Sequence, residues 1–259
     1  ATVVLNGGTY TRSKENGISS TDNGGNSFYT IQNQGTMTIN DDVTVNQGAD
    51  GNGKYSSLVT NGWYNGKQNT RKENAIMTVN GGVFNGGINT IKNDDWGIME
   101  IYDGTIQNSA QHALMNANKG AIYGGTFTTD STRGAVYAYA QYENTYGLGE
   151  LTIKGGEFTS NGAAALEAEA SSAISITGGT FSSDPSTYVA QGYTALEENG
   201  TYRVGKPITV SFVNEGTMVK TVEVLSGDTV SAPADPVKEG YVFQGWYNGD
   251  TKFNASSPV

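Results

Sequence analysis

A short pattern of apolar and glycine positions recurs along the chain. It contains two apolar residues separated by one position, then one variable position, two glycines, another variable position and an aromatic or aliphatic residue. Alternate apolar residues lie on one face of a strand, and a glycine pair marks a corner where a side chain would clash or φ turns positive. The copies begin at Val3, Met77, Met99, Gly120, Leu151 and Ile174; the copy at Met99 has Asp103 in place of the first glycine, and a degenerate copy at Met37 has Asp41-Asp42 in place of both.

A third apolar position follows several corners, at Ile91, Leu114, Val136 and Leu166. The corners at 103 and 124 are 21 residues apart and those at 155 and 178 are 23 residues apart. This spacing suits one turn, or rung, of a three-sided right-handed parallel β-helix. An antiparallel sandwich explains neither the recurring corner nor the repeated inward positions. We therefore predict an all-β fold with a parallel β-helix (solenoid) over residues 1–204. Its central core column consists of Leu5, Ile39, Val79, Ile101, Ile122, Ile153 and Ile176.

Three intervals between corners, 7–41, 41–81 and 124–155, are longer than one rung. The excess must leave the stack as side loops, which often form the binding face of a solenoid. Exposed aromatic rings there can stack on sugars, although rings that pack beneath their own loop are the simpler interpretation. The candidate ligand-binding residues are Trp63, Tyr64, Trp96, Tyr137, Tyr139 and Tyr142.

The repeat ends after Phe181, and residues 188–204 are expected to close the open end of the stack. A new alternation begins at Ile208 and continues past a turn at 214–216 and a loop marked by Pro233 and Pro236. Turn signals at this spacing predict a second, small β domain.

The second domain carries a distinctive set of motifs. They are Val210-Ser-Phe212, Gly227-Asp-Thr-Val230, Pro233-x-x-Pro236 and Glu239-Gly-Tyr-x-Phe-x-Gly-Trp-Tyr247. Together they resemble the internalin-type B-repeat, also called the Listeria–Bacteroides repeat. The resemblance implies a β-grasp-like spacer module of cell-surface proteins over residues 206–259, without the further strand that usually ends the family's pattern. The rung sequence Gly178-Gly-Thr-Phe-Ser-Ser183 similarly resembles β-helix segments in surface proteins of Gram-positive gut bacteria.

Composition narrows the function classes. Glycine occupies 36 of 259 positions and charged residues only 15%, which argues against a helical bundle. The chain has no cysteine and a net charge of −10, so we expect no thiolate metal site, no cofactor and no nucleic-acid partner. The sequence has no apolar run long enough to span a bilayer, and we expect an extracellular location at the bacterial cell wall.

Enzymatic chemistry has little support in the sequence. Parallel β-helices host polysaccharide lyases and hydrolases, which need clustered carboxylates. The acid pairs Asp41-Asp42 and Asp94-Asp95 are interpreted as solvated turns, and His112 is the only histidine. Residues 50–54 are faintly similar to a calcium loop but lack its third oxygen ligand and its closing glutamate. No catalytic or metal-binding residues are predicted.

The sequence thus favours a rigid adhesin or display rod on a spacer, binding a glycan or a host surface protein through its side loops. A carbohydrate-active enzyme on the β-helix is the first alternative, and a phage fibre or receptor-binding segment is the second.

Overall fold

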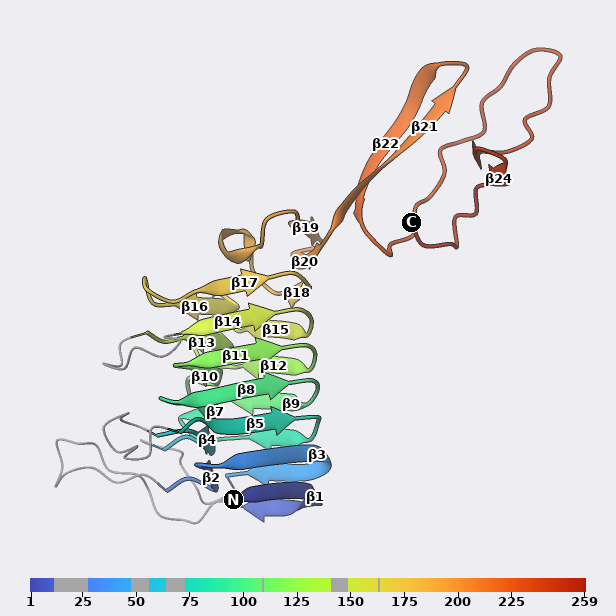
Figure 1. The fold of residues 1–259 in the computed structure, drawn as a ribbon. Coiled ribbons are helices and arrows are strands. Elements are labelled where there is room, and N and C mark those ends of the chain that lie inside the picture. Colours follow the sequence, from blue (N-terminus) through green and yellow to red (C-terminus); the bar gives the residue numbers. More distant parts are fainter. Residues whose placement is uncertain (12–27, 48–55, 64–72, 109, 141–148, 163) are drawn as a thin grey trace.

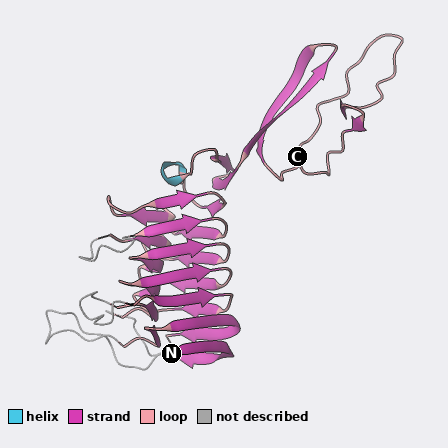
Figure 2. Ribbon diagram, viewed as in Figure 1, coloured by secondary structure: helices cyan, strands magenta, loops and turns pink. Residues whose placement is uncertain are grey.

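The computed structural model describes residues 1–11, 28–47, 56–63, 73–108, 110–140, 149–162 and 164–259. These residues form an all-β fold without an α-helix (Figure 2). One short 3-10 turn, η2, spans Ser186–Tyr188. The strands are stacked in order from β1, at the N-terminal end, to β18 (Figure 1).

Most strands belong to one large, mostly parallel sheet with two arms that meet at β3, Thr36–Asn46. β1 (Thr2–Thr11) pairs with β3 along its length. The first arm continues through β5 (Ala75–Val79), β8 (Gly97–Ile101), β11 (Lys119–Ile122), β14 (Glu150–Ile153) and β17 (Ile174–Ile176). The second arm continues through β6 (Val83–Asn85), β9 (Thr105–Asn108), β12 (Thr126–Thr129), β15 (Glu157–Ser160) and β18 (Gly179–Phe181).

A separate six-stranded sheet is parallel throughout. We call it the third sheet, because each repeat also has one strand in each of the two arms. It contains β2 (Ile31–Asn33), β4 (Val59–Asn61), β7 (Asn89–Asn93), β10 (His112–Asn116), β13 (Val136–Ala138) and β16 (Leu166–Ala168). Each complete repeat contributes one strand to each arm and one to this sheet, and we call such a repeat a rung. The parallel pairing contradicts the antiparallel sandwich that was the alternative.

The predicted core column is present in the register of the first arm. Each member is paired with the next, from Leu5 and Ile39 through to Ile153 and Ile176. All members except Leu5, which lies in the first rung and is half-buried, are at most 1% exposed. A second column, in the other arm, stacks Phe158 on Phe127 and Phe181 at centroid distances of 5.0 and 4.8 Å. Continuous apolar columns of this kind bury the face that a single rung cannot bury alone.

The two glycines of each corner have different roles. A Cβ at Gly155 would lie 2.3 Å from the carbonyl oxygen of Tyr123 in the preceding rung, and one at Gly178 would lie 2.2 Å from that of Lys154. The second glycine of each pair has a positive φ, as at Gly156 (102°), a conformation that residues with a Cβ rarely adopt. Both reasons predicted from the sequence are therefore confirmed: a side chain would clash at the first glycine, and φ is positive at the second.

The end of the stack is closed by a hairpin of β19 (Thr194–Glu198) and β20 (Thr201–Gly205). β20 pairs antiparallel with β18, and Phe181 lies opposite Tyr202. The closure expected over 188–204 is present, but its last strands run antiparallel to the rungs.

The C-terminal region begins with a hairpin of β21 (Pro207–Asn214) and β22 (Thr217–Leu225), which projects beyond β20 (Figure 1). Its turn has positive φ at Glu215 and Gly216, as a two-residue hairpin loop requires. A second pair, β23 (Tyr247–Asn248) and β24 (Thr251–Lys252), is short. Residues 241–246, directly before β23, form no strand.

Candidate functional site

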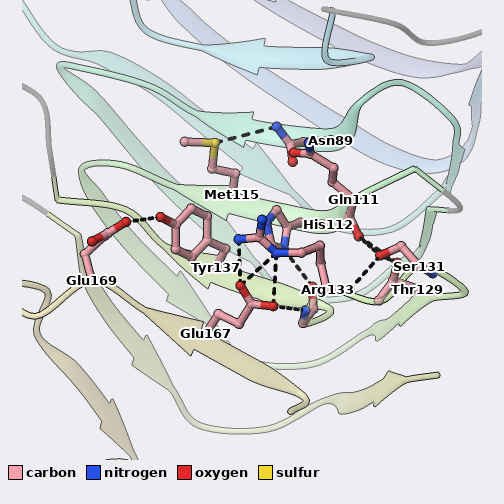
Figure 3. A network of polar contacts seen from close by, with 11 residues as sticks. Asn89, Gln111, His112, Met115, Thr129, Ser131, Arg133, Tyr137, Glu167 and Glu169 are labelled. Atoms are coloured by element: carbon pink, nitrogen blue, oxygen red, sulfur yellow. Dashed lines mark hydrogen bonds and ion pairs between the residues drawn. The ribbon is translucent and has the colours of Figure 1, made fainter. Parts of the chain in front are cut away.

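The candidate site lies on the outer face of the third sheet. Successive side chains of a strand point to opposite faces, so the buried residues Leu114, Val136 and Leu166 alternate with outward ones. The register places Met115 beside Tyr137 and Tyr137 beside Glu167. Figure 3 shows these outward side chains with His112, Arg133 and Glu169 in one network.

An ion pair joins two adjacent rungs at one side of this face. Arg133 donates from Nε and Nη2 to Glu167 Oε2, at 3.0 and 2.8 Å, and the backbone N–H of Gly134 donates to the same carboxylate. Burial acts to raise the pKa of Glu167, but the hydrogen bonds from Arg133 and Gly134 outweigh it and hold that pKa below its ordinary value. Glu167 is therefore a charged group that orients Arg133.

Tyr137 lies at the centre of the network. Its hydroxyl donates to Glu169, its ring stacks on His112 with centroids 4.8 Å apart, and the ring of Tyr139 meets it edge-on at 5.8 Å. Burial, and then the hydrogen bond to Glu169, raise the pKa of Tyr137 far above its usual value. The phenol therefore stays protonated and serves as a hydrogen-bond donor, not as a base.

His112 is buried and lies beneath the other side chains of the cluster. Its Nδ1 lies 2.8 Å from the carbonyl oxygen of Gly134, so the tautomer with a proton on Nδ1 donates this hydrogen bond. Burial lowers the pKa of His112, and the partial counteraction from its Gly134 contact and Glu167 does not reverse this. The imidazole is thus neutral near pH 7 and packs under Tyr137.

Among the residues that the structure describes, two of the predicted ligand-binding residues are brought together. Tyr137 and Tyr139 are brought together in the cluster, both partly exposed. Trp63, half-buried, follows β4 and forms an isolated bridge with Asp95. Trp96 is 8% exposed, which leaves its indole little surface for stacking. Tyr64 and Tyr142 lie outside the described residues.

The interpretation of Asp94-Asp95 as a solvated turn is wrong. Both residues are buried, and Asp94 Oδ2 lies 3.1 Å from the Nζ of Lys92, whose side chain is also buried. A buried charge of this kind needs its partner, because desolvation is costly. Asp41 and Asp42, in contrast, are exposed at the corner formed by β3, as predicted.

Four members of the cluster, His112, Arg133, Glu167 and Glu169, were missed. One signal was available: Glu167 and Glu169 have the same alternate spacing as Tyr137 and Tyr139 in the preceding rung. Aligning the third apolar positions, Val136 and Leu166, places each glutamate beside a tyrosine position.

A second aromatic contact, also missed, lies on the first arm. Tyr102 and Tyr123 stack with centroids 4.6 Å apart and an interplanar angle of 5°, and Lys154 Nζ lies 4.7 Å from the centroid of the Tyr123 ring. Because Tyr102 and Lys154 both pack on Tyr123, that ring has little free face for stacking on a ligand.

The cluster combines partly exposed rings with the charged groups of Arg133, Glu167 and Glu169. Such groups can bind the apolar faces and hydroxyls of a sugar. Within the described ranges no group of three or more histidine, cysteine, aspartate or glutamate residues is placed to hold a metal ion.

Comparison with known proteins identifies one part of the chain. Residues 209–259 match the Listeria-Bacteroides repeat domain family, in agreement with the resemblance found in the sequence. No solved structure matches the chain. No helix of the described part is long and apolar enough to cross a membrane. The matched residues carry a Listeria-Bacteroides repeat domain, which is consistent with a segment of an extracellular surface protein.

Proposed function

We propose that this chain is a segment of a bacterial surface adhesin, in which a right-handed parallel β-helix displays a glycan-binding face and the repeat module acts as a spacer. The parallel registers of the two arms and the third sheet support the β-helix. The Listeria-Bacteroides repeat supports the extracellular setting.

One observation carries the binding part of the proposal. Tyr137 projects from β13 between Val136 and Ala138, which are buried and paired in register with both neighbouring strands. Arg133 lies over the ring of Tyr137, and the hydroxyl of Tyr137 donates to Glu169. A face supported in this way is preorganised, so a ligand does not have to order it. Rings and charged groups on a rigid surface suit the faces and hydroxyls of a saccharide.

A glycan array on the whole chain, followed by calorimetric titration of the best ligand, tests this proposal. Tyr137→Ala should weaken binding at least tenfold, because it removes the central ring and its hydroxyl. Tyr102→Ala is the matched control: it deletes an exposed tyrosine on another face and should leave affinity unchanged. Binding that is equally strong in the Tyr137→Ala variant contradicts the proposed site.

A carbohydrate-active enzyme is the second candidate, and the carboxylates of Glu167 and Glu169 beside Tyr137 are the observation in its favour. The electrostatics favour binding instead. Glu167 is engaged by Arg133, and the raised pKa of Tyr137 removes it as a base. Depolymerisation of neutral or uronate polysaccharides that disappears in Glu169→Gln would establish the enzyme.

A further inference from the structure

The repeat module, residues 207–259, is connected to the closing hairpin of the stack through one residue. β20 ends at Gly205 and β21 begins at Pro207, so that Lys206 alone lies between the two strands. The hairpin of β21 and β22 projects from this point (Figure 1). Two parts of a chain that share one short connection move relative to each other unless further contacts hold them. The contacts at this joint therefore decide whether the module has a fixed angle to the stack.

An ion pair spans the joint beside this connection. Arg203 of β20 donates from Nη1 and Nη2 to the two carboxylate oxygens of Asp228, which follows β22, at 2.8 and 3.0 Å. Two parallel hydrogen bonds of this kind fix the relative orientation of the two groups as well as their distance. The side chains of Arg203 and Asp228 are 38% and 19% exposed, so water screens this pair less than a fully exposed one.

Both partners of the ion pair are held by the strands around them. Arg203 lies opposite Thr180 of β18 and Leu196 of β19. Asp228 Oδ2 accepts a hydrogen bond from the N–H of Leu225, and the N–H of Asp228 donates to the carbonyl oxygen of Leu225, both at 2.9 Å. The ion pair therefore connects the last strands of the stack to the base of the hairpin of β21 and β22.

Apolar packing brings the two parts close together at the same place. Leu225 is buried, and a Cβ at Gly205 would lie 3.2 Å from Cβ of Leu225. The end of β22 approaches β20 this closely because position 205 has no side chain. Apolar contact is not directional, so it keeps the module near the stack without setting its angle.

We propose that the Arg203–Asp228 pair is a latch that holds the repeat module at one angle to the stack, and that the module bends at Lys206 when the pair is broken. This inference concerns the joint alone and does not depend on ligand binding at the third sheet. The hairpin enlarges the effect of a bend. Thr217 and Leu225 are the two ends of β22 and lie about 26 Å apart, so a bend of about 20° at the joint moves Thr217 by about 9 Å.

Spin-label distances measured on the whole chain test the latch. Cysteine-linked labels at Thr159 on β15 and at Thr217, both exposed, report the angle between stack and module. Labels at Asn6 and Thr159 give the width of a distance distribution within the stack. With Arg203 and Asp228 in place, the pair 159–217 should give one peak about as narrow as this reference. A broad distribution, or more than one peak, overturns the proposal without any change at the latch.

Two variants assign the effect to the ion pair. Arg203→Gln removes the pair and should widen the 159–217 distribution at least about twofold, while the reference distribution within the stack stays narrow. Glu198→Gln is the matched control, because it changes only a longer contact of Arg203, at 3.6 Å, and should leave the 159–217 distribution narrow. An unchanged width in Arg203→Gln, or equal widening in both variants, would contradict the latch.

Hydrogen exchange separates a change of angle from local unfolding. Arg203→Gln leaves the hydrogen bond from the N–H of Leu225 to Asp228 in place, so exchange of the Leu225 amide should stay as slow as in the unchanged chain. Faster exchange of this amide would show that the base of the hairpin has come apart, and it would overturn a role of Arg203 in orientation alone.

Discussion

The side-chain amide of Asn61 donates from Nδ2 to Oδ1 of Asn93, one rung further along the stack, at 2.9 Å. The same contact joins Asn33 to Asn61 and Asn93 to Asn116, at 2.7 and 2.8 Å. The four buried residues form an asparagine ladder inside the third sheet. Each amide thereby satisfies its neighbour in an interior where an unpaired polar group would be costly.

Breaking this ladder should destabilise the fold. In Asn93→Leu, the amide that donates to Asn116 Oδ1 and the carbonyl oxygen of Lys119 is lost. Asn61 Nδ2 also loses one of its acceptors, Asn93 Oδ1, and keeps only the carbonyl oxygens of Ala75 and Ile98. We expect a loss of about 2–4 kcal/mol in the free energy of unfolding, measured by urea denaturation. Asn80→Leu breaks an exposed asparagine contact, with Asn40, and should cost less than about 0.5 kcal/mol. An equal loss in the free energy of unfolding in Asn93→Leu and Asn80→Leu would show that burial does not determine how much the ladder stabilises the fold.

Gly178→Ala should be poorly tolerated. The new Cβ would lie 2.2 Å from the carbonyl oxygen of Lys154, so adjacent rungs must separate, at a cost of about 1–3 kcal/mol. Gly7→Ala is the control, because it changes the same motif position in the first rung, where the nearest atom is Cβ of Asp42 at 3.2 Å. Thermal unfolding that is equally affected in both variants would contradict the role assigned to the first glycine of the corner.

His112 should make stability depend on pH. Its pKa is lowered in the folded state by burial, so the unfolded chain takes up the proton first. The neutral imidazole therefore contributes fully to the free energy of unfolding above pH 6.5, which is about the pKa of histidine in the unfolded chain. This contribution is lost as the pH falls through the lower pKa of the folded state. The urea concentration at the midpoint of unfolding should therefore decrease as the pH is lowered from 7 to 5. His112→Gln should make this decrease smaller. An imidazole that titrates above pH 6.5 in NMR would contradict the assigned environment.

The base of the projecting hairpin depends on Asp228. Its carboxylate accepts two hydrogen bonds from Arg203, at 2.8 and 3.0 Å, and one from the N–H of Leu225 at 2.9 Å. Asp228→Ala should accelerate hydrogen exchange of the Leu225 amide, whereas Glu198→Gln, which alters a more exposed contact of Arg203 at 3.6 Å, should not. An unchanged exchange rate in Asp228→Ala would show that this amide is protected in another way.

The repeating part of the stack could be predicted because its signals are local. Alternation at Val79 and Ile101 defines strands, and the glycine pair defines the corner, within a few residues of sequence. The asparagine ladder could not be predicted in this way, since its contacts are separated by 28, 32 and 23 residues. Loops of unequal length conceal the common position until the register is known.

The candidate site was predicted in part for the same reason. Tyr137 and Tyr139 are conspicuous as alternate aromatic residues, whereas Glu167 and Glu169 resemble ordinary solvated charges until the adjacent rung brings them together. Asp94 was misassigned because nothing in its local sequence indicates that Lys92 is buried with it. In the C-terminal region the motif of residues 239–247 identified the family, although residues 241–246 within it form no strand.

Distances between spin labels test the stacking of rungs most directly. Asn6, Asn80 and Lys154 each follow the core column by one residue, and the rungs of Asn40, Tyr102 and Tyr123 intervene. Adjacent parallel strands lie about 4.8 Å apart, so Lys154 is five rungs from Asn6 and three from Asn80. With cysteine-linked labels in this cysteine-free chain, double electron–electron resonance should give about 24 Å for positions 6 and 154 and about 14 Å for positions 80 and 154. Equal distances for the two pairs, or a shorter distance for positions 6 and 154, would contradict the stack on which the proposed display function rests.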